Sequence, residues 1–204
     1  MHIGHVQLAK EAIDTLKLDA LRCIPAGEPP HRNAPQANPE QRLAMVQLAF
    51  AKYPQVVVDP AEVRQTGPSW TIRTLERLRQ EAPEASHVLI LGADALLGLP
   101  TWHCWESLLD YAHIAVANRP DADFVASQLP EPMRSFWAKH HANDLAVLHQ
   151  QPAGRLVSFT IAPCKVSATQ VRQTASQGLS ISGLVPQAVE NYIIQHHLYT
   201  QTAH

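Results

Sequence analysis

The chain has 204 residues, a formal net charge of −2 and a sequence pI near 6.6, with 46% hydrophobic and 17% charged residues. This near-neutral balance argues against a general nucleic-acid-binding protein, which usually carries a clustered basic excess. No apolar run approaches the roughly 18 residues that a membrane-spanning helix needs, so no membrane association is expected.

The first half of the chain shows alternating helical and strand patterns. Apolar positions at helical spacing predict a helix over residues 6–16, and a short apolar run predicts a strand over 19–24. Asn38 is suited to cap a helix over 39–52, because Pro39 occupies its first position. Three consecutive valines predict a buried strand over 56–58.

The second half continues the alternation, apart from residues 121–155, which contain prolines and show no clear period. The expected elements are helices over 69–81, 169–175 and 186–195 and strands over 87–91, 113–117 and 156–161. Helices that alternate with strands predict a single α/β domain over residues 1–204, built on a parallel sheet.

The three cysteines, Cys23, Cys104 and Cys164, are far apart and include no Cys-x-x-Cys pair. This pattern argues against a disulfide framework or a thiolate zinc site and favours a reducing cytoplasmic compartment. The twelve histidines include no His-x-x-x-His pair with an acidic partner, so no metal-ligating residues are predicted. A histidine-based metal-binding protein is the most distant functional alternative.

Polar clusters follow several of the predicted strands. His31 and Arg32 come after the first strand, Asp94 after the strand over 87–91, and Arg119 after the strand over 113–117. Open α/β sheets bind ligands beyond the carboxyl ends of their strands, so these positions are candidates for a binding site.

The chain opens with His2-x-Gly4-His5 at the start of the first predicted helix. Residues three apart share a helical face, so both imidazoles can point at one ligand. The helix N-terminus favours phosphate, and Gly4 would let a nucleotide approach the backbone. Two incidental histidines at a chain terminus would give the same pattern.

A second candidate phosphate site lies near the other end of the chain. Ser167 and Thr169 place hydroxyls where a helix is expected to begin, and Arg172 follows one turn later. Hydroxyls, unpaired backbone N–H groups and a forked guanidinium together form a cradle for phosphate. An ordinary helix cap with a solvated arginine is the structural alternative.

These two motifs resemble the nucleotide motifs of the nucleotidyltransferase superfamily, and the blocks between them resemble the nicotinate-nucleotide adenylyltransferases. The similar blocks are 24–32, 42–45, 67–71, 92–94, 99–102 and 118–120, and, in the tail, 185–193 and 198–199. The resemblance runs in order along nearly the whole chain and is weakest over 121–150. It implies a Rossmann-like parallel sheet flanked by helices.

The resemblance implies that AMP is transferred from ATP to nicotinate mononucleotide, giving deamido-NAD and pyrophosphate in NAD biosynthesis. Mg²⁺ would neutralise the leaving group. His2, His5 and Arg172 would be catalytic. The residues expected to bind ATP are Gly4, His31, Arg32, Ser167, Thr169 and Arg172.

The same resemblance implies a pyridine-nucleotide site. Trp102 would stack on the pyridine ring, Trp70 and Thr71 would flank it, Asp94 would orient a ribose or loop hydroxyl, and Arg119 would complete the site. A packing role for Trp102, a solvated loop for His31 and Arg32, and an ion pair for Arg119 are the structural alternatives.

The family's Gly-Gly-x-Phe-Asp-Pro element, which ends the first and central strand, does not precede His2. We therefore expect a chain that lacks this strand through a misassigned gene start. Made alone, such a chain is predicted to be unstable or inactive, because neighbouring strands would keep unpaired backbone groups.

Two alternatives to the nicotinate enzyme remain. One is a related adenylyltransferase that uses nicotinamide mononucleotide or another phosphate acceptor, such as phosphopantetheine. The other is a non-catalytic remnant that binds nucleotide without turnover.

Overall fold

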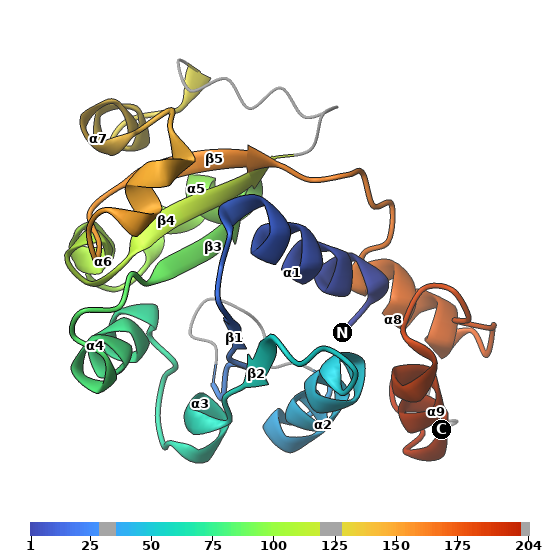
Figure 1. Ribbon diagram of the computed structural model, residues 1–204. Coiled ribbons are helices and arrows are strands. Elements are labelled where there is room, and N and C mark those ends of the chain that lie inside the picture. Colours follow the sequence, from blue (N-terminus) through green and yellow to red (C-terminus); the bar gives the residue numbers. More distant parts are fainter. Residues whose placement is uncertain (29–35, 119–127, 201–204) are drawn as a thin grey trace. The chain divides into compact units, whose positions relative to one another are not determined.

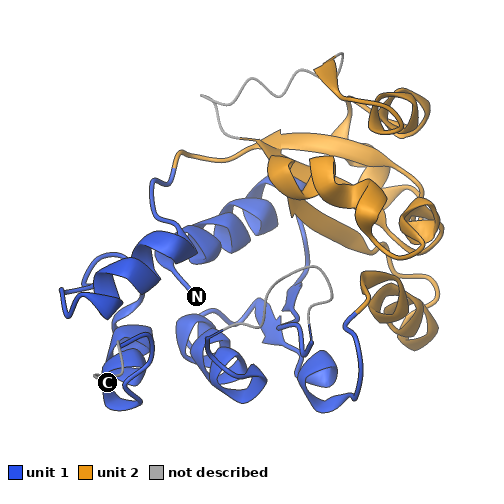
Figure 2. Cartoon of the chain, turned by 180° about the vertical axis from the view of Figure 1, so that it is seen from behind, with its two compact units in different colours: residues 1–69, 164–204 blue, residues 70–163 orange. Residues whose placement is uncertain are grey.

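The computed structural model describes residues 1–28, 36–118 and 128–200 (Figure 1). They form two compact units, of which unit 1 comprises residues 1–69 and 164–204 and unit 2 comprises residues 70–163 (Figure 2). Both units combine helices with parallel strands, which confirms the predicted α/β class.

Unit 1 combines the N-terminal third of the chain with its C-terminal helices. Its elements are α1 (Ile3–Leu16), β1 (Leu21–Cys23), α2 (Pro39–Phe50), β2 (Val56–Val58), α3 (Ala61–Arg64), α8 (Ala168–Ser176) and α9 (Gln187–Gln195). Strands β1 and β2 pair in parallel, with Leu21 opposite Val56. Within the described residues these two strands form a sheet of their own.

The core of unit 1 forms where apolar side chains from the two ends of the chain meet, and α2 packs against α9. Its buried members include Val6, Ala9, Met45, Phe50, Val171, Val189 and Ile193. The helix over 39–52 was predicted almost to its ends. Asn38 caps α2 as expected, since its Oδ1 accepts from the Gln41 N–H at 2.9 Å.

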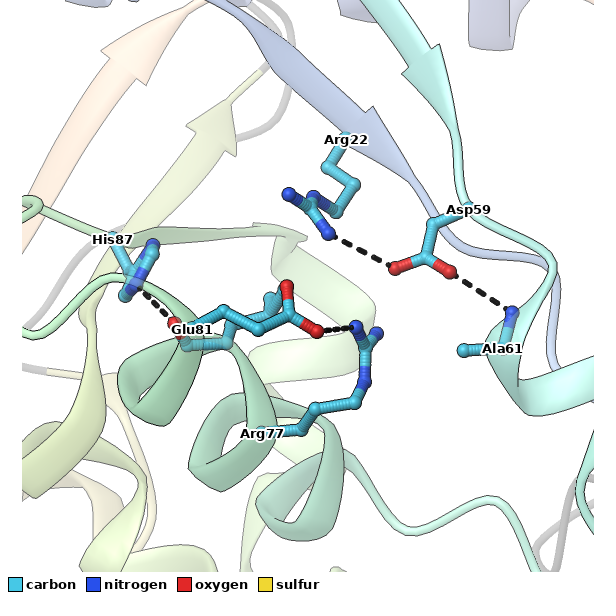
Figure 3. A network of polar contacts seen from close by, with 7 residues as sticks. Arg22, Asp59, Ala61, Arg77, Glu81 and His87 are labelled. Carbon is cyan, nitrogen blue, oxygen red and sulfur yellow. Dashed lines mark hydrogen bonds and ion pairs between the residues drawn. The ribbon is translucent and has the colours of Figure 1, made fainter.

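A short polar network fixes the ends of β1 and β2. The Asp59 carboxylate, which follows β2 and is only 8% exposed, accepts from Arg22 of β1 at 3.3 Å and from the Ala61 N–H at 2.9 Å (Figure 3). The second of these bonds pairs the N–H of the first residue of α3, which has no acceptor within the helix. The Asp59 carboxylate therefore links β1 to the start of α3.

Unit 2 is built around a three-stranded parallel sheet in the order β3-β4-β5 (Figure 1). Its elements are α4 (Thr71–Glu81), β3 (Val88–Gly92), α5 (Ala93–Gly98), η1 (Leu99–Thr101), η2 (Trp105–Ser107), α6 (Leu108–Tyr111), β4 (His113–Asn118), α7 (Met133–His140), η4 (Leu145–His149) and β5 (Leu156–Thr160). The strands agree with the predicted ones to within about one residue at each end.

The central strand β4 is the most completely buried element of unit 2, since residues 113–117 are at most 6% exposed. Its first residue, His113, is polar but makes two hydrogen bonds. Nε2 lies 2.8 Å from the Gln151 carbonyl, and Nδ1 accepts from the Arg155 N–H at 3.1 Å. This pairing fixes the neutral imidazole with its proton on Nε2.

The guanidinium of Arg79, near the end of α4, joins three segments of unit 2. It donates to the carbonyls of Pro83, Ala85, Tyr111 and Pro152 at 2.6–2.8 Å. The same helix carries the Arg77–Glu81 ion pair, and the Leu78 carbonyl bonds His87 at 3.1 Å (Figure 3). Hence α4 is held to the loops that lead into β3 and β5.

Candidate functional site

The two histidines of the first motif lie together at the start of α1. His2 has an extended backbone and precedes the helix, and its N–H donates to Nδ1 of His5 at 3.3 Å. The two rings have centroids 3.9 Å apart and an interplanar angle of 36°. The predicted shared face is therefore present, and α1 begins three residues earlier than the apolar spacing indicated.

Gly4 packs closely against its surroundings. A Cβ atom built on it would lie 3.0 Å from the Cys164 sulfur and 3.1 Å from Cε1 and Nδ1 of the His2 ring. The space that a side chain at Gly4 would need is therefore occupied by Cys164 and His2. A side chain at this position would require Cys164 or His2 to shift.

The backbone of Gly4 still offers a donor. In the first turn of α1, the Ile3 N–H donates to the Leu184 carbonyl and the His5 N–H donates to the His2 carbonyl, both at 3.0 Å. The Gly4 N–H has no such partner among the described residues. An unpaired N–H at a helix N-terminus is suited to an anionic ligand.

The second motif forms the start of α8 as predicted. Ser167 is the N-cap residue, and its Oγ accepts from the Gln170 N–H at 3.1 Å. One turn along, Nη2 of Arg172 donates to Oγ1 of Thr169 at 3.3 Å. Ser167 and Thr169 are exposed, and Arg172 is half-buried.

The two motifs meet at a small cavity in unit 1, about 20 Å³ in volume. It is lined by Met1, His2, Ala168, Val171, Arg172, Ile193 and Tyr199. The structure thus brings His2 and Arg172 together, although 170 residues separate them in the sequence. His5 contacts the cavity-lining His2 without lining the cavity itself.

Sequence reasoning missed Tyr199, which lies near the C-terminus. Burial raises the pKa of its phenol, against the opposing effect of the nearby Arg172 and Arg42 guanidinium groups. The phenol therefore stays protonated at neutral pH. Only its place in the tail that resembles the family could have drawn attention to it.

Arg42 has a structural role in unit 1. Its guanidinium donates to the carbonyls of Ala37, Ala26 and Gly27 at 2.6–3.1 Å. Ser69 holds the same loop, because its buried Oγ accepts from the N–H groups of Gly27 at 2.9 Å and Glu28 at 3.3 Å. These contacts fix the chain that leads to the segment with His31 and Arg32.

In unit 2, Trp70 already has aromatic and cationic neighbours. Its ring stacks on His103 with centroids 3.9 Å apart, and Cζ of Arg73 lies 4.6 Å from the ring centroid. His103 is exposed and packs on Trp70. Thr71 is half-buried and begins α4.

Trp102 differs from Trp70, since its half-exposed ring has no aromatic or cationic partner among the described residues. It follows η1, where its N–H donates to the Leu99 carbonyl at 2.9 Å. Asp94 is exposed in the first turn of α5, directly after β3, as the strand-end argument predicted.

A larger hollow of about 280 Å³ also lies in unit 2. It is lined by Ile72, Arg73, Glu76, His103, Cys104, Ser107, Asp110 and Tyr111. None of the predicted substrate residues lines it. His31, Arg32 and Arg119 lie outside the described residues.

The described residues contain neither a metal-binding cluster nor a membrane-spanning helix. No group of three or more His, Cys, Asp or Glu side chains in residues 1–28, 36–118 and 128–200 is arranged to hold a metal ion. In the same part of the chain, every helix is too short or too polar to span a bilayer.

Comparison with known proteins points to one family. Residues 1–174 match the family model described as cytidylyltransferase-like. A probable nicotinate-nucleotide adenylyltransferase of Dechloromonas aromatica (strain RCB) is 44% identical over 98% of the chain and 92% of its own length. The protein of the same name from Pseudomonas aeruginosa (strain UCBPP-PA14) is 46% identical with the same coverage.

Solved structures agree on the fold. The Plasmodium falciparum nicotinic acid mononucleotide adenylyltransferase, solved with NaAD, has a TM-score of 0.68 at 12% identity, over 98% of this chain and 91% of that one. A putative nicotinate-nucleotide adenylyltransferase from Vibrio parahaemolyticus has a TM-score of 0.63 at 13% identity, over 98% and 89%.

Proposed function

Since the chain belongs to the cytidylyltransferase-like family and, within it, to the nicotinate-nucleotide adenylyltransferases, we propose that it joins ATP and nicotinate mononucleotide to give deamido-NAD and pyrophosphate. One structural observation supports this most directly. His2 and Arg172, each from one predicted phosphate motif, line a single cavity in unit 1.

The reaction needs no protein nucleophile. An oxygen of the mononucleotide phosphate forms a bond to the α-phosphorus of ATP, and the bond from that phosphorus to the bridging oxygen breaks. Pyrophosphate leaves with the electron pair. Catalysis therefore consists of positioning the two phosphates and stabilising the charge that develops on them.

The residues of unit 1 would supply this stabilisation. His2, His5 and Arg172 would contact the phosphates of ATP, Ser167 and Thr169 would hold the triphosphate tail, and the Gly4 N–H would donate to it. His31 and Arg32 would add cationic contacts to a phosphate. Loss of one preorganised donor typically raises the barrier by about 3 kcal/mol.

The residues of unit 2 would recognise the second nucleotide. Trp102 is the best candidate to stack on the pyridine ring, because its exposed face has no partner among the described residues. Trp70 and Thr71 would flank the ring, Asp94 would orient a hydroxyl, and Arg119 would contact the mononucleotide.

Magnesium enters this proposal as part of the substrate. Mg²⁺ prefers oxygen ligands and is commonly bound through substrate phosphates. The cavity-lining residues of unit 1 include no carboxylate, so they are suited to phosphate oxygens rather than to a metal ion. Mg²⁺ would therefore arrive bound to ATP and lower the charge of the departing pyrophosphate.

We also propose that the two units are parts of a single nucleotidyltransferase domain, since one family model runs through residues of both. A cytoplasmic location is consistent with the three cysteines, all of which are free thiols.

The proposal is tested by incubating the purified protein with Mg·ATP and either nicotinate or nicotinamide mononucleotide, and by quantifying the dinucleotide and pyrophosphate. Deamido-NAD should form faster than NAD. Arg172→Ala should lower kcat/KM by about a hundredfold, whereas Arg134→Ala, which removes an exposed arginine paired with Glu131, should not change it.

The other outcomes discriminate between the alternatives. Preference for the amide nucleotide would assign the related activity. Binding of ATP with no pyrophosphate release in any mixture would identify a non-catalytic nucleotide-binding protein.

A further inference from the structure

Tyr199 is held in an unusual backbone conformation just beyond α9. Its φ is +66° and that of His197 is +48°, both in the left-handed region that side chains other than glycine seldom adopt. Between them, Leu198 is buried and its N–H donates to the Ile193 carbonyl at 3.0 Å. The helix end thus fixes where the Tyr199 ring lies.

The ring lies against the core of unit 1, and its side chain lines the 20 Å³ cavity together with His2 and Arg172. The Arg172 guanidinium is close enough to act electrostatically on the phenol, as is Arg42. No acidic residue lines the cavity. Its surroundings therefore favour an anion.

The hydroxyl of half-buried Tyr199 is a donor that can reach solvent, since it is not one of the buried polar atoms left without a partner. Burial raises the pKa of the phenol, so it keeps its proton at neutral pH. Within residues 1–28, 36–118 and 128–200, this hydroxyl makes no hydrogen bond. A cavity of about 20 Å³ has room for roughly one water-sized group, which matches a single phosphate oxygen.

We propose that Tyr199 is a binding residue whose hydroxyl donates a hydrogen bond to a phosphate oxygen of ATP held between His2 and Arg172. This rests on the proposed function, because that function supplies the triphosphate. Arg42 is committed to backbone carbonyls, so the phenol and Arg172 are the side-chain donors that the cavity offers beside His2.

The test measures binding of inorganic tripolyphosphate by isothermal titration calorimetry, which requires no turnover. Tyr199→Phe removes only the hydroxyl and should weaken binding about tenfold, the effect expected for a hydrogen bond to a charged group. Tyr192→Phe is the matched control, because the Tyr192 ring packs at a tilt against His196 and does not line the cavity.

Equal affinities of wild-type protein and Tyr199→Phe would overturn the proposal, and so would a wild-type protein that does not bind tripolyphosphate. Thermal unfolding of both variants, expected to match the wild type, separates a lost contact from a lost fold. A wild-type protein that binds tripolyphosphate but makes no dinucleotide would contradict the proposed function alone. The role of Tyr199 in phosphate binding would still be tested by the calorimetry.

With an active enzyme, Tyr199→Phe should raise KM for ATP by a similar factor and leave KM for the mononucleotide unchanged. A purely structural role would move both constants or neither.

Discussion

The sulfur of Cys164 lies 3.0 Å from the point that a Cβ atom would occupy on Gly4, at the centre of the His2-x-Gly4-His5 motif. The ring of His2, which belongs to the same motif, lies almost as close to that point. The position of this ring therefore depends on the absence of a side chain at Gly4 and on the size of residue 164.

Gly4→Ala should displace His2 or Cys164. Overpacking of this kind typically costs about 1–3 kcal/mol of stability, and moving His2 should also weaken tripolyphosphate binding. Denaturant titration and calorimetry measure the two effects. Gly98→Ala is the control, because a Cβ there meets no atom within 4 Å.

Adding Cys164→Ala to Gly4→Ala should recover part of the lost binding, because it removes the sulfur that the new methyl group meets. If the effects of the two single substitutions on binding simply add in a double-mutant cycle, the contact between residues 4 and 164 does not determine the position of the histidines.

Ser69→Ala should destabilise unit 1. Its buried hydroxyl accepts from the N–H groups of buried Gly27 and exposed Glu28, and a buried donor left unpaired costs roughly 1–3 kcal/mol. Urea unfolding followed by circular dichroism gives the change. Ser180→Ala, which removes an exposed hydroxyl with one local bond, should stay near the wild-type value.

Trp102→Ala should raise KM for nicotinate mononucleotide by about tenfold, since stacking and burial of an aromatic side chain are lost. KM for ATP should stay constant, and Trp102→Phe should retain most of the affinity. Steady-state kinetics with each substrate varied in turn measures this. Equal increases in both constants would contradict a role confined to the pyridine ring.

His113 makes stability depend on pH. Burial lowers its pKa, Arg79, Arg155 and His149 lower it further, and the bond to Gln151 opposes this only in part. A group whose pKa is lower in the folded state stabilises the protein above its unfolded pKa, near 6.5 for histidine. That stability is lost as the pH falls through the folded pKa.

The free energy of unfolding should therefore fall more steeply from pH 7 to pH 5 in the wild-type protein than in His113→Gln, which cannot titrate there. Urea titrations at several pH values measure the slopes. His196→Gln, at an exposed position, should keep the wild-type slope. Identical slopes for all three proteins would show that His113 does not control this dependence.

Local signals were enough to predict several parts of the fold. The apolar run at 113–117 is almost fully buried in β4, and Asn38 and Ser167 cap the helices that follow them. In each case the information lies within a few residues of the chain. Such patterns do not depend on tertiary contacts.

Other features depend on distant partners and left no local signal. The helix α7 was not predicted, because prolines interrupt the pattern around it. The stacking of His103 on Trp70 and the packing of Cys164 on Gly4 join segments far apart in sequence. Spacing rules could predict His2 and Arg172 as candidates for phosphate binding, but not that Tyr199 lines the same cavity.

The two-stranded sheet of unit 1 has a consequence for handling the protein. Each of its strands is an edge within the described residues, and Val57 in the middle of β2 is 48% exposed. Unpaired strand edges recruit strands from other molecules, which leads to aggregation. The edges of this sheet are only three residues long, which limits such pairing, and Val57→Lys should limit it further by placing a charge at the exposed position.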